Sequence, residues 1–217
     1  EICACLVGSE MCIRDRYISV QRESYYNMKD ITLWNIMLKG DTKPLEVLYK
    51  RHYELLLNFG LKYVSDEEFV KDCIQDLFVK LCSSTRLSPT DYVRSYLLTS
   101  LKNLIFDKLS SLKSTEDINA LPFDLTIEDT SLEVLFKDND EDIQMIKNLQ
   151  EAYKQLSENQ RMAIYLRYIK GLSYREVAAV LEINPQSAMN LVSRTLTSLR
   201  SKMTLKEYLF FLPFFLS

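Results

Sequence analysis

Residues 171–200, GLSYREVAAVLEINPQSAMNLVSRTLTSLR, contain two helix starts in close succession, and this pattern restricts the fold more than any other part of the chain. Ser173 and Glu176 have the S-x-x-E spacing of a capping box, which predicts a first helix that begins after Ser173. Asn184 followed by Pro185 is an N-cap with proline in the first helical position, which predicts a second helix. Only a tight turn fits between the two, as in a helix-turn-helix.

The second predicted helix has one apolar and one polar face. Its apolar positions recur with the 3.6-residue period and are expected to pack inward. The opposite face carries Gln186, Asn190, Ser193, Arg194, Thr197 and Arg200. Amides and arginines can bond base edges or phosphates. This face also has few acidic residues, which would repel DNA. An ordinary amphipathic surface helix with a solvated face is the alternative.

The charge distribution is compatible with DNA binding, although the whole chain of 217 residues has a net charge of −3. Residues 151–206 hold nine lysines and arginines against four acidic residues, whereas residues 114–142 hold ten acidic residues and only Lys137. The charge is therefore segregated, and the average conceals a basic C-terminal part. Four glycines and nearly continuous helical periodicity, without an alternating strand pattern, predict an all-α fold.

The sequence disfavours enzymes, metalloproteins and membrane proteins. It has five cysteines and one histidine, His52, without a C-x-x-C pair or metal-ligand spacing, so no metal or other cofactor is expected. His52 is expected at a helix surface or partly packed. No phosphate loop, paired-carboxylate site or nucleophile constellation is present, which predicts no catalysis and no small-molecule substrate. No apolar stretch is long enough to span a membrane, and cysteines without partners suit a cytoplasmic protein.

The helical pattern predicts two small helical domains joined by an acidic linker, the C-terminal one a helix-turn-helix. Residues 28–113 form the first domain, residues 114–142 the linker and residues 143–206 the second domain. Residues 1–27 are expected to be a non-native or disordered leader, because their first part resembles translated sequencing-adapter read-through. Residues 207–217 form an apolar tail, which either packs on its own domain or docks on a partner or a membrane surface.

The helix predicted at 67–81 has a polar face with some apolar content. Asp72, Gln75, Asp76 and Val79 fall together on it, apart from the buried stripe. Because carboxylates repel phosphates, this face suits a protein partner better than DNA. A merely solvated face is the alternative.

The dipeptide Ser88–Pro89 repeats the cap-plus-proline signature and predicts a helix from residue 89 to about residue 113. Lys102, Asn103 and Phe106 share one of its faces. A cation for the backbone, an amide for a base edge and a ring for stacking are typical of single-stranded DNA binding. Packing of Phe106 on a neighbouring helix is the alternative.

Together these segments resemble bacterial RNA polymerase sigma factors of the sigma-70 type, in the extracytoplasmic-function (ECF) group. VKDCIQDLFVKL (70–81) is similar to the polymerase-binding segment of that family, and SYLLTSLKNLIFDKL (95–109) is similar to the segment that melts and reads the −10 promoter element. Residues 156–200 are similar to the domain that binds the −35 element. On these three segments, in this order and divided by an acidic linker, the chain is identified as a member of the family.

The resemblance implies a sigma factor that binds core RNA polymerase and directs it to promoter DNA. Core polymerase would be bound through Asp72, Gln75 and Asp76. The −10 element would be contacted by Lys102, Asn103 and Phe106. The −35 element would be contacted by Pro185, Gln186, Ser187, Asn190, Ser193, Arg194 and Arg200. A further implied partner is an anti-sigma protein, a class that is often membrane-anchored.

Some positions depart from the usual pattern of the family. Ser110 and Ser111 stand where paired arginines are frequent, Glu182 where glycine is common in the turn, and Met189 where lysine is common. These departures predict that the isolated C-terminal domain binds DNA weakly and needs polymerase. The alternative function is a stand-alone helix-turn-helix regulator that does not dock on polymerase.

Overall fold

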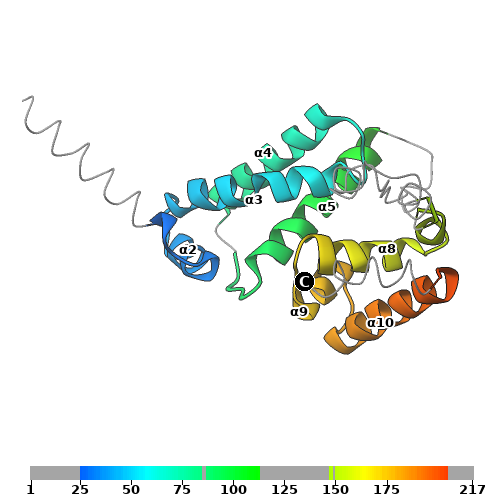
Figure 1. Ribbon diagram of the computed structural model, residues 1–217. Coiled ribbons are helices and arrows are strands. Elements are labelled where there is room, and N and C mark those ends of the chain that lie inside the picture. Colours follow the sequence, from blue (N-terminus) through cyan, green and yellow to red (C-terminus); the bar gives the residue numbers. More distant parts are fainter. Residues whose placement is uncertain (1–24, 85–86, 113–146, 149, 205–217) are drawn as a thin grey trace, which may run out of the picture.

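Figure 1 shows the computed structural model of the chain, which describes residues 25–84, 87–112, 147–148 and 150–204. Within these ranges every regular element is a helix, as the sequence predicts. Most of the predicted leader, and all of the predicted acidic linker and apolar tail, lie outside the described residues.

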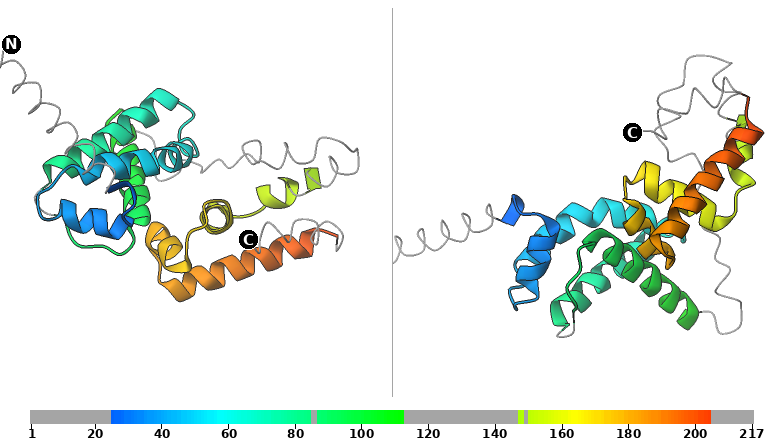
Figure 2. Two further views of the ribbon diagram at one scale, coloured as in Figure 1. Left: turned by 60° about the vertical axis from the view of Figure 1, so that its left-hand side comes forward. Right: turned by 90° about the horizontal axis from the view of Figure 1, so that it is seen from below.

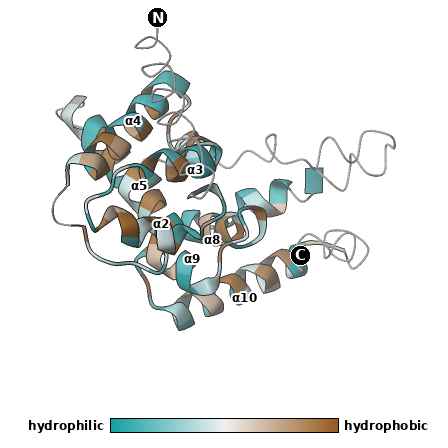
Figure 3. Ribbon diagram, turned by 90° about the vertical axis from the view of Figure 1, so that its left-hand side faces the viewer, coloured by the Kyte–Doolittle hydropathy of each residue, from teal (hydrophilic) through white to brown (hydrophobic). Residues whose placement is uncertain are grey.

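The N-terminal helices pack around a shared apolar core. They are α2 (Asp30–Met37), α3 (Pro44–Gly60), α4 (Glu67–Ser83) and α5 (Val93–Leu112). Helices α3, α4 and α5 contact one another, and α2 packs against α3 and α5. Trp34, Leu48, Ile74 and Leu101 are wholly buried between them. Figure 3 shows the alternation of hydrophobic and hydrophilic residues along these helices that produces such a core.

Gly60 lies where α3 closely approaches α4 and α5. A Cβ atom at this position would overlap Cγ1 of Val70 on α4 and would lie 3.4 Å from Cδ1 of Ile105 on α5. Both neighbours are fully buried, so neither can move aside without disturbing the core. The absence of a side chain at Gly60 therefore permits the close packing of the three helices.

The structure corrects the predicted start of the helix at 89–113, because α5 begins only at Val93. The backbone carbonyl of Ser88 accepts a hydrogen bond from Trp34 Nε1 at 3.1 Å, which holds this segment against α2. The Thr90 hydroxyl accepts a hydrogen bond from the Tyr92 backbone N–H at 3.1 Å. The side chain of Thr90, not that of Ser88, thus makes the contact just before the helix. Pro89 lies in the non-helical segment that leads into α5.

His52 is buried on α3, where it pairs with the first residue of α2. Its Nε2 lies 2.8 Å from Oδ2 of Asp30, and the guanidinium of Arg51 binds the other carboxylate oxygen. The hydrogen bond from His52, followed by the contact with Arg51, lowers the pKa of Asp30 below its usual value of 3.8 despite partial burial. These contacts fix the start of α2 to α3.

The C-terminal helices form a second group. They are α8 (Glu158–Ile164), a π-helical turn η3 (Tyr165–Ile169), α9 (Tyr174–Leu181) and α10 (Pro185–Lys202). Both predicted helix starts are confirmed, since Ser173 and Glu176 form a complete capping box and the Asn184 side chain caps α10. Figure 2 shows the two groups of helices side by side. They meet where α9 packs on α5, and α9 lies between α5 and α10 (Figures 1 and 3).

Replacement of Gly60 by alanine should destabilise the chain by about 1–3 kcal/mol, because the added methyl group overlaps Val70 in a closely packed core. Urea unfolding followed by circular dichroism measures the loss. Asn58→Ala, at an exposed position of the same helix, is the matched control and should change the free energy of unfolding by less than about 0.5 kcal/mol. Equal stability of the two variants would contradict the close approach.

The Asp30→Asn variant should be less stable than the wild type at pH 7 by about 1 kcal/mol, because the ionised carboxylate binds His52 and Arg51. The folded-state pKa of Asp30 is lowered, so its contribution is present above 3.8 and is lost as the pH falls through the folded-state value. The difference between the two proteins should shrink in that acidic range. Asp91→Asn, at an exposed position, is the control, and a difference that is independent of pH would refute the assignment.

Candidate nucleic-acid interface

Helix α10 exposes the polar face predicted to read DNA. Pro185, Gln186, Asn190, Ser193, Arg194 and Arg200 are exposed, and Ser187 is half-buried. The backbone N–H of Ser187 donates to Asn184 Oδ1 at 2.7 Å, so this part of Ser187 serves the cap. Ala188, Val192, Thr195 and Leu199 are buried on the opposite side, as predicted. The polar face of α10 is therefore exposed, as the sequence predicts.

The turn before α10 is held by a residue in the left-handed conformation. Glu182 has a φ of 57°, a region that glycine enters freely and that costs other residues about 1 kcal/mol. Backbone N–H groups of Glu182 and Ile183 donate to Ala179 and Ala178 carbonyls, which closes the end of α9. The departure from glycine at Glu182 is therefore accommodated without lengthening the turn.

Helix α5 carries the residues predicted for the −10 element, but they are not equally accessible. Asn103 is exposed. Lys102 Nζ lies 3.3 Å from Oε1 of Glu182, in the turn of the helix-turn-helix. The ring of Phe106 is half-buried and packs edge-on against Tyr63, with 5.5 Å between ring centroids. In this arrangement Phe106 has the packing contact that the sequence left as the alternative to base stacking.

Helix α4 carries the face predicted to bind polymerase. Asp72 and Gln75 are exposed, and Val79 retains 60% of its surface exposed, which is high for an apolar side chain. Asp76 is half-buried, and its Oδ2 lies 2.6 Å from Lys108 Nζ on α5. The hydrogen bond to Asp76 raises the pKa of Lys108. Asp76 therefore joins α4 to α5, whereas Asp72 and Gln75 have no such structural role in the described contacts.

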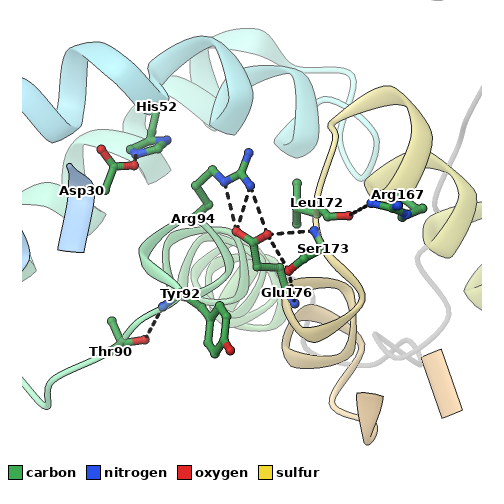
Figure 4. Close-up of polar contacts among 9 residues, drawn as sticks. All are labelled: Asp30, His52, Thr90, Tyr92, Arg94, Arg167, Leu172, Ser173 and Glu176. Atoms are coloured by element: carbon green, nitrogen blue, oxygen red, sulfur yellow. Dashed lines mark hydrogen bonds and ion pairs between the residues drawn. The ribbon is translucent and has the colours of Figure 1, made fainter. Parts of the chain in front are cut away.

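One carboxylate joins the two groups of helices. Glu176 on α9 is only 8% exposed, and it accepts hydrogen bonds from Nε and Nη2 of Arg94 on α5 at 3.1 and 3.0 Å (Figure 4). The same carboxylate accepts a hydrogen bond from the Ser173 backbone N–H at 2.8 Å, within the capping box. The contact is the two-pronged arginine–carboxylate arrangement, which fixes both distance and orientation. Glu176 thus ties the start of the helix-turn-helix to α5.

Weaker contacts surround this ion pair. Arg175 Nη1 donates to the Tyr92 hydroxyl at 3.3 Å, and the Lys102–Glu182 pair lies on the other side of the contact. The Tyr63 hydroxyl also contacts the C-terminal group, 3.8 Å from the sulfur of Met162 on α8, and burial raises the pKa of Tyr63. The contacts between the two groups therefore include polar pairs from α9 to α5 and a buried contact between Tyr63 and Met162.

Arg167 braces the segment that leads into α9. Its Nη1 donates to the Leu172 carbonyl at 3.0 Å (Figure 4), and its guanidinium lies 4.7 Å from the centroid of the Tyr174 ring. Gly171, with a φ of 64°, turns the chain at this point. No pattern in the sequence marks Arg167 or Arg94, whose contacts only the fold brings about. The π-helical turn that carries Arg167 was also not predicted, because capping patterns mark only the ends of helices.

In the described part of the chain, no group of three or more His, Cys, Asp or Glu side chains has the arrangement of a metal site. The described helices also lack one long and apolar enough to cross a membrane.

In the described residues the fold is helical and exposes a helix-turn-helix, the arrangement of a class of DNA-binding proteins. The family models "Sigma-70 region 2" and "Sigma-70, region 4" match residues 48–115 and 146–199. The first range covers α4 and α5, and the second covers α8, α9 and most of α10. The chain belongs to the sigma-70 family of RNA polymerase sigma factors, in the ECF group.

Individual relatives agree with this assignment. The chain is 25% identical over 162 residues to the RNA polymerase sigma factor CarQ of Myxococcus xanthus, covering 74% of this chain and 90% of CarQ. It is 24% identical over 167 residues to the ECF RNA polymerase sigma factor SigX of Bacillus subtilis (strain 168), covering 75% of this chain and 85% of SigX. A solved structure of CnrH in complex with the cytosolic domain of CnrY has the same fold, with a TM-score of 0.51, 20% identity and coverage of 79% of this chain and 95% of that chain.

The Arg94→Glu variant should separate α9 from α5, because it places two carboxylates together while leaving the Ser173–Glu176 capping box intact. A zero-length carbodiimide crosslinker should join Lys102 to Glu182 in the wild type, where the ammonium and carboxylate groups lie 3.3 Å apart. Mass spectrometry should show this crosslink reduced at least several-fold in the variant.

Crosslinks from Lys71 to Glu67 and Glu68, whose groups lie 2.8 Å apart within α4, provide the internal control and should be unchanged. An undiminished Lys102–Glu182 crosslink in Arg94→Glu would show that Arg94 does not hold the two groups together.

Proposed function

We propose that this sigma factor binds core RNA polymerase through the exposed face of α4 and reads promoter DNA with α5 and α10. The observation that carries the proposal is the order of the two family matches. The region 2 match falls on the helices with the acidic face, and the region 4 match falls on the helix-turn-helix. A stand-alone regulator would need the α10 face but has no use for a matched region 2.

For the −35 element, the proposal assigns base and phosphate contacts to Gln186, Asn190 and Arg194, which lie on the exposed face of α10. Pro185, Ser187, Ser193 and Arg200 complete the set by positioning the helix and its backbone contacts. For the −10 element, it assigns Asn103, which is exposed, together with Lys102 and Phe106 once these leave Glu182 and Tyr63.

Promoter geometry requires the two groups of helices to separate. Elements centred near −10 and −35 lie about 25 base pairs apart, which is about 85 Å of duplex. In the arrangement described above, Lys102 of α5 is only 3.3 Å from the turn that precedes α10. We therefore propose that residues 28–113 and 143–206 act as separate domains on promoter DNA, joined by the acidic segment 114–142.

The proposal extends to partners and location. The α4 face combines carboxylate, amide and the exposed Val79, a mixture that suits a protein surface better than DNA. Core polymerase is the first partner, and an anti-sigma protein is the second; the related fold of CnrH is bound by the cytosolic domain of CnrY. Since the chain works on polymerase, we place it in the cytoplasm, and we assign it no catalytic step and no cofactor.

Copurification with core polymerase tests this function. The Asp72→Arg variant should lose at least tenfold in retention by core polymerase, because it reverses the charge at an exposed position of the proposed docking face. Retention on immobilised core polymerase and run-off transcription from a promoter library are the two measurements. Asp72 is preferable to Asp76 for this test, because reversal at Asp76 would also repel Lys108 and disturb the fold.

Glu54→Arg makes the same charge change at an exposed position of α3 and is the matched control. It should retain polymerase binding and transcription. Failure of the wild-type chain to bind core polymerase, with retained DNA binding, would favour the stand-alone regulator instead.

A further inference from the structure

Met189 is an apolar side chain in the middle of the polar face of α10. It is 45% exposed, and it lies three residues after Gln186 and four before Ser193, positions that are neighbours on a helix surface. Gln186, Met189, Asn190 and Ser193 together form what we call the reading patch. Met189 stands where the family commonly has a lysine, but its place in this patch allows it a contact of its own.

The amides beside Met189 are already organised. Gln186 Nε2 donates a hydrogen bond to Asn190 Oδ1 at 3.2 Å. With that bond made, Gln186 still has its amide oxygen as an acceptor and Asn190 still has its amide N–H groups as donors. An acceptor beside a donor is complementary to adenine in the major groove, which offers the N6 amino group and the N7 acceptor.

We propose that Met189 is a specificity-determining residue that contacts the C5-methyl group of thymine in the −35 element. This inference rests on the proposed function of α10. Thymine is the base that offers an apolar group in the major groove, so it is the base that gains from an exposed thioether. The amides and Met189 together select A·T pairs at adjacent positions. Met189 distinguishes thymine from cytosine only because cytosine has no C5-methyl group for the thioether to contact.

The surroundings of Met189 indicate DNA as the occupant of this face. It lies near the N-terminus of α10, where a recognition helix contacts base edges. The first turn of α10 has no acidic residue, and Asn184 caps it through Ser187. Arg194 is exposed one turn further along. On the exposed face of α10, Met189 is an apolar group among amides and a hydroxyl, and apart from it the nearest exposed large apolar side chain is Ile183 in the preceding turn. Such a small apolar area suits a base edge, whereas the buried centre of a protein–protein interface needs a larger one.

The experiment uses the full chain with core polymerase. A promoter is first selected from a library with a randomised −35 element by run-off transcription, which tests the proposed function on its own. Each thymine of the selected −35 element is then replaced in turn by deoxyuridine, which removes only the methyl group. Wild-type holoenzyme should lose about three- to fivefold in promoter affinity at one of these positions, the effect of removing one methyl group from an apolar contact.

The Met189→Ala holoenzyme should bind the thymine promoter as weakly as the wild type binds the uracil promoter, and uracil should cause no further loss. Arg194→Ala is the control, since loss of a charge that is indifferent to the methyl group should weaken binding to both promoters equally. Equal wild-type affinity for thymine and uracil at every position would overturn the proposal. So would a selected element without thymine in the major groove, or an undiminished uracil effect in Met189→Ala. Failure to transcribe from any library member would instead refute the proposed function.

Discussion

The carboxylate of Glu176 has two partners, and the arrangement of the molecule depends on both. Within α9 it completes the capping box with Ser173, and across the interface it receives two hydrogen bonds from Arg94. An almost buried carboxylate is costly unless it is fully hydrogen-bonded, and here the cap and the arginine together satisfy it. The start of the helix-turn-helix and its position against α5 are therefore fixed by the same group.

This contact affects the two surfaces that we propose bind DNA unequally. Because α9 lies between α5 and α10, the exposed face of α10 remains accessible while α9 stays on α5. On α5, by contrast, Lys102 is held by Glu182 and Phe106 is held by Tyr63. The surface proposed for the −35 element is thus exposed while α9 packs on α5. On the surface proposed for the −10 element, separation of the two groups would release Lys102 from Glu182, but Phe106 would still have to leave Tyr63 within its own group. The Lys102–Glu182 pair is solvent-exposed and contributes little, so Arg94 and the buried contacts dominate the closed state.

The features that sequence reasoning predicted correctly are those fixed by neighbours along the chain. The caps at Ser173 and Asn184 involve residues three positions apart, so the pattern contains both partners. The Ser88–Pro89 prediction failed because its outcome depends on Trp34, which binds the Ser88 carbonyl from 54 positions away. Arg94 and Glu176 are 82 positions apart, and neither has a local pattern that marks an ion pair. The same limit applies to Phe106, whose position was decided by Tyr63.

Glu182 shows how a departure from the family pattern can be linked to the closed arrangement. A glycine in this turn would adopt the left-handed conformation without strain, whereas Glu182 pays about 1 kcal/mol for a φ of 57°. A glycine, however, has no carboxylate to place beside Lys102. The residue that strains the turn is thus the residue that connects the turn to α5. The turn imposes this strain whether the two groups of helices are in contact or apart. The ion pair with Lys102 forms only when they are in contact, and an exposed pair of this kind contributes at most about 1 kcal/mol. Glu182 therefore slightly favours the arrangement in which α9 packs on α5 and Lys102 is paired with Glu182.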